Sequence, residues 1–517
     1  MKETSPRQTK RLFRLQAAER KSNNFIVENL IKAGVFACLF LFHHTAVSQE
    51  WKFNDQQRQA YELVFRLRMD EARRLLPPPC SLQDIYIHSL SETIELLVTE
   101  DPKKFQLFER RFESRVSEES KTAMQQFVEA EMRLQWSFVY LKFGNEMDAA
   151  FNLRSAYNLA RNCRKKNPGF IPVRKTTGML DIMIGAVPEK YGWILSLLGL
   201  EGNIGKGLKD LTLVASSGTD LASEAAVLHA VINTFVLQKP AEGTKEIKNS
   251  VAIHRDRKLV LFLAAAIAMK NSESGYALSL LENANFTLSP EMKENNELSI
   301  PYAQYLRGEA YLHKGAYQRA IDAYSSFISN YAGINYLKDS YFKTGLCYWL
   351  VGDRMKARSY FDEARSRGKE STEADKHAAR TLMSGEEPNI PLSQVRHFTD
   401  GGFYIQADST IRAIAPAMLR SKKEQVEYYY RKARLAHKLG QHEAAKLFYA
   451  QTIDMSESDN WYFAPNSSLQ LGYIAVENGD IPTARKWFLK ALGYKKHEYK
   501  NSIDAKAKSA LSQLKAR

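Results

Sequence analysis

The sequence predicts an all-α fold, an α-solenoid built from antiparallel helix pairs. Three observations support this prediction. Small and large residues recur in the C-terminal half at the spacing of two helices joined by a turn. Stretches of alternating polar and β-branched residues, which predict strands, are nearly absent. The 517 residues are 44% hydrophobic and include only 26 Gly and 16 Pro, a composition that allows long helices around a large core.

Residues 1–48 resemble a targeting signal rather than part of the fold. Eight basic and three acidic residues precede the apolar run 33–42, and Ala46 and Ser48 occupy positions −3 and −1 of a cut before Gln49. This pattern predicts a secretory signal peptide and export to the periplasm or cell envelope. Because a membrane-spanning helix needs about 20 apolar residues, an uncleaved anchor formed by residues 33–42 is the alternative, and an ordinary buried helix is a third interpretation.

The net charge gives only a weak indication of partners. The whole chain carries +15, and without residues 1–48 the excess is +10, spread along the chain. No basic run shows the aromatic interleaving of a nucleic-acid-binding face. We therefore predict no nucleic-acid partner, and contact with a membrane only through an uncleaved leader.

Cysteine and histidine spacing predicts neither disulfides nor a metal site. Besides Cys38, the chain has Cys80, Cys163 and Cys347, far apart and without a CxxC motif. The sequence contains no HExxH motif, and the five-residue spacing of His437 and His442 places them off a common helical face. We expect no metal and no cofactor.

The repeated unit is clearest in segments 305–327, 341–364, 429–452 and 468–491. Each copy places a small residue where two helices cross, a glycine at the turn and a large ring on the second helix. The small residues are Gly308, Gly345, Ala433 and Gly472; the turn glycines are Gly315, Gly352, Gly440 and Gly479; the rings are Tyr324, Phe361, Tyr449 and Phe488. This is the pattern of a tetratricopeptide repeat.

Weaker copies at 133–160 and 259–284, and a partial unit at 59–79, extend the repeats upstream. The resulting organisation is 1–48 signal peptide, 49–177 N-terminal helical repeats, 178–215 a helical hairpin, 216–383 repeats including two strong units, 384–402 a linker, and 403–517 C-terminal units with a closing helix. The linker is predicted from its Pro and Gly residues.

The segment "LLGLEGNIGKGLKDL", residues 197–211, raises the question of a phosphate-binding loop. A Walker motif requires a glycine where Leu200 stands and a hydroxyl residue where Gly207 stands. The apolar residues on both sides recur at helical spacing. We therefore predict a turn between helices, with Gly199 and Gly202 ending one helix and Asn203 capping the next.

The same region carries a family resemblance. Residues 178–211, with "LLGLEG" after Pro188, and residues 462–514, with "HEY" before the last helix, resemble the tetratricopeptide repeat protein 39 family and its fungal relatives, the inclusion-body clearance proteins. With the repeats, the likeness spans roughly 55–515. It implies an all-helical protein that acts through partners, without a known active site. Those relatives are intracellular, whereas this chain carries a predicted export signal.

The sequence favours a non-catalytic scaffold that holds another protein on the inner wall of a superhelix. The repeat template places Tyr305, Phe342, Arg431 and Tyr473 on that wall, although aromatic residues at helical spacing more often belong to a core. The partner and the oligomeric state are not specified by the sequence.

Two other classes of function stay open. An exported glycan- or envelope-binding protein would use Trp349, Trp461 and Trp487 as stacking platforms. An enzyme would use carboxylates such as Glu92, Glu95 and Glu131, but we expect these to be solvated and no motif names a reaction.

Overall fold

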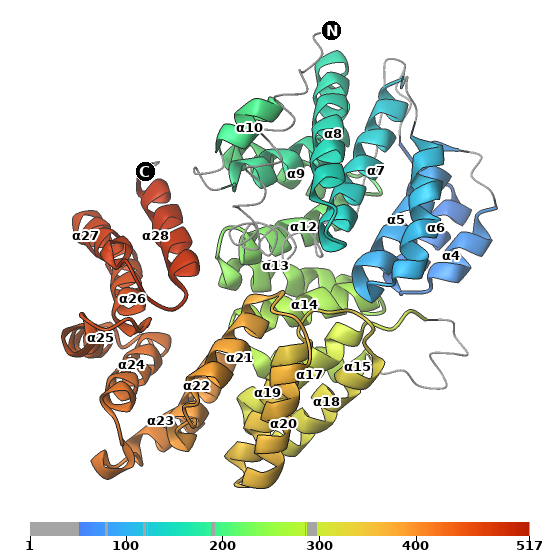
Figure 1. Ribbon diagram of the computed structural model, residues 1–517. Helices are drawn as coiled ribbons and strands as arrows, with labels where there is room; N and C mark the ends of the chain where they lie inside the picture. Colours follow the sequence, from blue (N-terminus) through green and yellow to red (C-terminus); the bar gives the residue numbers. More distant parts are fainter. Residues whose placement is uncertain are drawn as a thin grey trace, which may run out of the picture. The chain divides into compact units, whose positions relative to one another are not determined.

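The computed structural model describes residues 51–77, 81–116, 120, 122–187, 192–284, 286 and 297–515. Over these residues the chain forms 25 α-helices and no strand (Figure 1). The all-α prediction is confirmed: the fold is a tetratricopeptide-repeat-like α-solenoid. The predicted leader and its cleavage site before Gln49 lie outside the described residues.

The chain divides into two compact units, which we call unit 1 and unit 2. Among the described residues, unit 1 comprises those up to residue 308 together with 321–344 and 360–380, and unit 2 comprises residues 309–320, 345–359 and 381–515. The helices wholly within unit 1 are α3 Asp55–Phe65, α4 Met69–Leu75, α5 Leu82–Thr99, α6 Pro102–Arg115, α7 Ala123–Lys142, α8 Glu146–Lys166, α9 Val173–Gly185, α10 Gly192–Leu198, α11 Ile204–Ala215, α12 Ala222–Phe235, α13 Pro240–Ile253, α14 Lys258–Lys270 and α15 Ser274–Asn283.

Five helices contribute residues to both units: α17 Pro301–Lys314, α18 Tyr317–Asn330, α19 Leu337–Leu350, α20 Arg354–Ser366 and α21 Glu373–Ser384. Unit 2 also contains α22 Ile390–Gly401, α23 Tyr404–Arg412, the 3-10 helix Pro416–Met418, α24 Lys422–Lys438, α25 His442–Ser456, α26 Phe463–Glu477, α27 Ile481–Gly493 and α28 Lys500–Lys515.

The repeat glycines have the two roles that the template predicts. The turn glycines Gly315, Gly352, Gly440 and Gly479 have φ values of +78°, +90°, +72° and +76°, a left-handed conformation that side chains disfavour. At the helix crossings, a Cβ on Gly472 would lie 2.4 Å from the ring of Phe488, and one on Gly308 would lie 2.5 Å from the ring of Tyr324. The small and large positions therefore pack directly against each other.

Within the segment predicted as a hairpin, residues 178–215, the described residues form most of α9, all of α10 and all of α11. Asn203 caps α11 by accepting a hydrogen bond from the Lys206 amide at 2.9 Å, and Gly199 has φ +66°. The Lys206 ammonium lies 3.6 Å from the Asp181 carboxylate. The helix that precedes the glycines and the carboxylate partner of Lys206 favour an interhelical turn over a phosphate-binding loop.

The predicted linker at 384–402 is wrong over residues 390–401, which form α22. Asn389 caps this helix through the Leu392 amide, Pro391 stands in its first turn, and Gly402 ends it at φ +83°. Leu392 and Val395 are fully buried. The residues that we interpreted as a break are thus start and stop signals of one short helix.

Unit 1 is closed by contacts between residues far apart in sequence. Arg257 pairs with Glu62 at 2.5 Å, the Phe53 amide donates to Asp220 at 2.8 Å, and Asn335 donates to Glu100 at 3.0 Å. These contacts join α3, the residue Phe53 that precedes it and the end of α5 to segments more than 150 residues later in the sequence.

The core of unit 1 contains a group of ionisable side chains. Lys175 is 1% exposed, Glu224 1% and Glu131 2%. The Lys175 ammonium donates to Glu224 at 2.5 Å, Tyr86 donates to Glu224 at 2.8 Å, and Thr176 donates to Glu131. Burial raises the pKa of Glu131 well above its usual range, partly offset by Lys175.

No helix of the described segments combines the length and apolar character needed to cross a bilayer. The side chains of Cys163 and Cys347 are both buried. Burial raises the pKa of Cys163 to about 12, so its thiol is unreactive at neutral pH.

Candidate functional site

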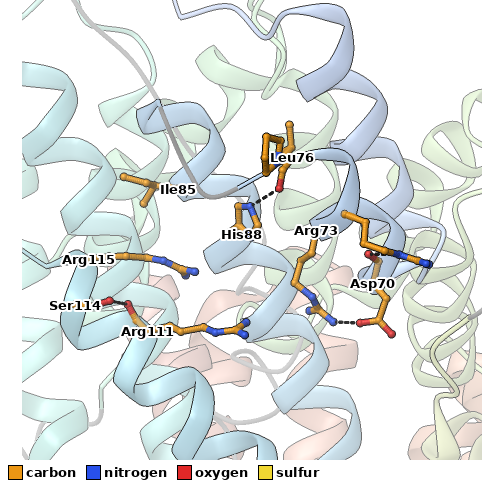
Figure 2. A pocket seen from close by; sticks show the side chains of 10 residues that line it. Asp70, Arg73, Leu76, Ile85, His88, Arg111, Ser114 and Arg115 are labelled. Carbon is orange, nitrogen blue, oxygen red and sulfur yellow. Dashed lines mark hydrogen bonds and ion pairs between the residues drawn. The ribbon is translucent and has the colours of Figure 1, made fainter.

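A basic pocket lies between α4, α5 and α6 in unit 1. Its volume is about 1060 Å³, and the described residues that line it are Asp70, Arg73, Arg74, Leu76, Pro77, Ile85, His88, Arg111, Ser114 and Arg115. Figure 2 shows Arg111 and Arg115 extending from α6 toward His88 and Arg73. Four of the ten lining residues are arginines, so the pocket presents mainly hydrogen-bond donors to a ligand.

The amphipathic pattern of α6 positions two of these arginines. Asp101 caps the helix and Pro102 occupies its first position. Phe108 and Phe112 are buried, and Phe112 stacks on Trp136 with ring centroids 4.8 Å apart. Arg111 lies three residues after Phe108, and Arg115 lies three residues after Phe112. Because the two phenylalanines are packed against the protein, both guanidinium groups are directed toward the pocket.

Two buried carboxylates on α5 hold the cations in place. Glu92 is fully buried and accepts from Arg111 at 3.0 Å and from Arg115 at 2.6 Å. Glu95 is 2% exposed and pairs with Arg73 at 2.8 Å and with Lys104. Each buried carboxylate is therefore shared by two cationic side chains.

The local charge is positive despite these pairs. Five cations, Arg73, Arg74, Lys104, Arg111 and Arg115, surround three carboxylates, those of Asp70, Glu92 and Glu95. Burial alone lowers the pKa of Arg73, but Glu95 and Asp70 more than offset it and the pKa is raised. The arginines stay charged, and an excess of two positive charges results.

His88 adds a neutral ring to the pocket. Its Nε2 lies 3.2 Å from the Leu76 carbonyl oxygen and donates to it. Burial lowers the pKa of His88, and the nearby charge of Arg115 lowers it further. The imidazole is therefore uncharged at neutral pH.

The structure corrects our expectation that Glu92, Glu95 and Glu131 are solvated. All three are buried, because cations or a hydroxyl donor compensate each carboxylate. Glu92 and Glu95 are tied to the arginine cluster, and Glu131 accepts from Thr176. The pattern "LSETIELL", with two glutamates inside an apolar run, was the signal of a buried ion-pair cluster that we missed.

Three of the four predicted inner-wall residues are packed inside the protein. Tyr305 is 4%, Phe342 5% and Arg431 6% exposed. Tyr305 donates to Asp339 at 2.7 Å, Phe342 stacks on Phe361 with centroids 5.6 Å apart, and Arg431 pairs with Glu427 at 2.5 Å. Their geometry favours the core-packing alternative.

Tyr473 alone of the four is partly exposed. Its ring packs edge-on against Phe488 with centroids 5.4 Å apart, and burial raises its pKa to about 12. Tyr305 and Phe342 belong to unit 1, whereas Arg431 and Tyr473 belong to unit 2. The four residues therefore fall into two pairs, and their role in partner binding stays a prediction.

The three tryptophans proposed as stacking platforms for a glycan are packed against other parts of the protein. Trp349 is 3% exposed and donates to the Pro388 carbonyl oxygen at 2.9 Å, so its face is not free for a glycan. Trp461 and Trp487 pack against the core of unit 2.

His437 and His442 approach each other, with ring centroids 5.9 Å apart, because the turn between α24 and α25 brings them together. No group of three metal-ligating side chains occurs within the described ranges.

Family models match two segments of the chain, and both describe a tetratricopeptide repeat. They cover residues 294–333 and residues 426–459. No curated protein matches the sequence. The matched segments coincide with two of the strong repeats predicted above, and such repeat folds are typically non-catalytic.

Several solved structures are similar to the chain at low identity. A tetratricopeptide repeat protein from Parabacteroides merdae is 14% identical, with 56% of this chain and 98% of that chain covered and a TM-score of 0.24. The apo form of the quorum sensor NprR from B. thuringiensis is also 14% identical, with coverages of 71% and 97% and a TM-score of 0.33. The human IFIT1 dimer with PPP-AAAA is 13% identical, with coverages of 86% and 96% and a TM-score of 0.29.

The chain carries tetratricopeptide repeats at residues 294–333 and 426–459.

Proposed function

We propose that this protein is a non-catalytic scaffold that binds another protein through its helical repeats. The observation that carries the proposal is the presence of two tetratricopeptide repeats, since such arrays generally mediate protein–protein interactions. Glu92 and Glu95 support it, because buried carboxylates held by arginines are poorly placed to act as general acids or bases.

The cellular location of this function depends on residues 1–48, the predicted signal peptide. We propose that residues 1–48 direct export, with Gln49 as the mature N-terminus, and that the protein acts in the periplasm or cell envelope. We propose that the protein shares with the tetratricopeptide repeat protein 39 family the helical fold and the action through partners, but not the intracellular location. N-terminal sequencing of fractionated cells tests this point: a soluble pool that retains Met1 would contradict export.

Affinity capture followed by reconstitution tests the scaffold. The tagged full chain is expected to capture a protein that, once purified, binds it in a one-step titration with Kd below about 10 µM, a free energy near −7 kcal/mol. Failure of every captured protein to bind after purification would contradict the proposal.

Two variants assess the predicted inner wall. Tyr473→Ala is expected to weaken partner binding while the melting temperature stays close to the parent, since this side chain is partly exposed. Phe342→Ala is expected to lower the free energy of unfolding by about 3–5 kcal/mol, as for other buried aromatic residues. If the Phe342→Ala protein is as stable as the parent but does not bind the partner, Phe342 belongs to the binding surface and not to the core.

A further inference from the structure

The pocket between α4, α5 and α6 has unused hydrogen-bond donors. Arg111 gives only Nη1 to Glu92, at 3.0 Å, and its side chain is 43% exposed. Arg74 gives Nε to the Asp70 carbonyl oxygen at 3.3 Å, and no carboxylate of the described segments pairs with it. Each guanidinium carries five N–H groups, so several of them are available to an anionic ligand.

Three of the four arginines, Arg73, Arg111 and Arg115, are held in position before any ligand binds. Arg115 is fixed by two hydrogen bonds to Glu92, at 2.6 and 3.1 Å. The guanidinium groups of Arg73 and Arg111 lie 5.6 and 5.4 Å from the centre of the Phe108 ring, within the range of cation–π attraction. Because these side chains have already lost rotamer freedom, binding an anion costs less conformational entropy.

The walls of the pocket select the kind of anion. Leu76, Pro77 and Ile85 line it beside the arginines, so a ligand with both carboxylates and apolar side chains matches it. Among the described residues that line the pocket there is no Phe, Tyr or Trp, whereas single-stranded nucleic acids are usually bound by aromatic stacking along a row of cations. Arginine forms bidentate hydrogen bonds with carboxylates.

We propose that this pocket binds an acidic peptide segment, with glutamate or aspartate next to an apolar residue, of the partner protein. This inference deepens the proposed scaffold function and rests on it. The carboxylates of the segment pair with Arg74 and Arg111 at the rim, and its apolar side chain packs on Ile85 and Leu76. The inner-wall residues of the repeats are not required for this contact.

Fluorescence anisotropy with a defined peptide tests the proposal. The probe is a dye-labelled eight-residue peptide with four Glu, two Leu and two Gly, and its control has Gln at each Glu position. The full chain is expected to bind the Glu peptide at least about tenfold more tightly than the Gln peptide, a difference of about 1.4 kcal/mol, because only the Glu peptide carries charges that pair with the rim arginines. Arg74→Gln with Arg111→Gln is expected to abolish this preference. Glu92 keeps Arg115 as its partner in this variant, so folding is retained.

Arg110→Gln is the matched control, because Arg110 is an exposed arginine on the same helix that does not line the pocket. It is expected to leave peptide affinity unchanged. An equal loss in Arg110→Gln, or equal binding of both peptides, would overturn the proposal. A single-stranded oligonucleotide that binds more tightly than the Glu peptide, with that binding lost in the double variant, would assign the pocket to nucleic acid instead.

The purified partner separates this inference from the scaffold function. If the double variant still binds the partner with parental affinity, the scaffold stands and the pocket is not its binding site. If the Glu peptide binds but no protein partner does, the pocket binds acidic peptides and the scaffold proposal fails.

Discussion

At the residue scale, burial determines what each charged side chain can do. Glu92 and Glu95 are as inaccessible as core leucines, and each is compensated by two cations. In the sequence these are glutamates on predicted helices, and such side chains are usually exposed to solvent. Only the three-dimensional proximity of α4 and α6 reveals why they are buried.

The buried group Lys175, Glu131 and Glu224 predicts an unusual pH dependence. Burial raises the pKa of Glu131 and of Glu224 above the ordinary value of 4.5. A carboxyl whose pKa rises on folding binds a proton in the folded state at pH values where the unfolded chain has lost it. The two carboxyls therefore make the free energy of unfolding decrease as the pH rises above 4.5, by up to about 1.4 kcal/mol per pH unit for each proton taken up on folding. Burial lowers the pKa of Lys175, which acts in the opposite direction at pH values between its lowered pKa and 10.5.

Glu131→Gln is expected to make the free energy of unfolding fall less as the pH rises. Its amide oxygen still accepts the hydrogen bond from Thr176, and it does not titrate. Urea unfolding at pH 5 and pH 7 measures the effect. Glu370→Gln, at an exposed position, should keep the parental difference between the two pH values. A Glu131→Gln protein with the parental difference would show that Glu131 titrates normally.

At the element scale, the sequence predicted the repeats well because their signals are local. The small residue at the crossing, the glycine at the turn and the ring on the second helix all lie within one helix pair. Helix α22 was missed for the opposite reason: Asn389, Pro391 and Gly402 are equally compatible with a loop and with the caps of a helix. The burial of Leu392 and Val395 decides between these interpretations, and burial depends on neighbours that the local sequence does not specify.

The crossing of α9 and α11 predicts different outcomes for two nearby glycines. A Cβ on Gly207 would lie 2.5 Å from the Gly178 carbonyl oxygen, whereas a Cβ on Gly205 would meet nothing closer than the Asn203 side chain at 3.5 Å. Gly207→Ala is therefore expected to destabilise the protein by about 1–3 kcal/mol through overpacking. Gly205→Ala is expected to be neutral or stabilising, since alanine favours the helix by about 1 kcal/mol. Thermal unfolding of both variants checks this; equal effects would mean that the two helices do not approach closely.

At the scale of the whole molecule, the two units are connected internally in different ways. In unit 2, the packed helix pairs are neighbours or next neighbours along the chain among the described helices, such as α24 with α25 and α26 with α28. Unit 1 adds contacts between distant segments, including α3 with α14. Arrays with only neighbour contacts lose cooperativity as they lengthen, whereas distant contacts join segments into one unfolding unit.

Hydrogen exchange in two variants tests this difference. Arg257→Gln breaks the ion pair with Glu62 and the hydrogen bond to Ser223, so exchange is expected to accelerate both in residues 55–65 and in residues 222–235. Gly472→Ala places a Cβ against Phe488, and its effect should be confined to the helices that pack on α26, within residues 422–515. Mass spectrometry of exchanged peptides gives the pattern. If Gly472→Ala accelerates exchange as much in residues 123–185 as in residues 463–493, the chain unfolds as one cooperative body. The difference in connectivity between the units then has no thermodynamic consequence.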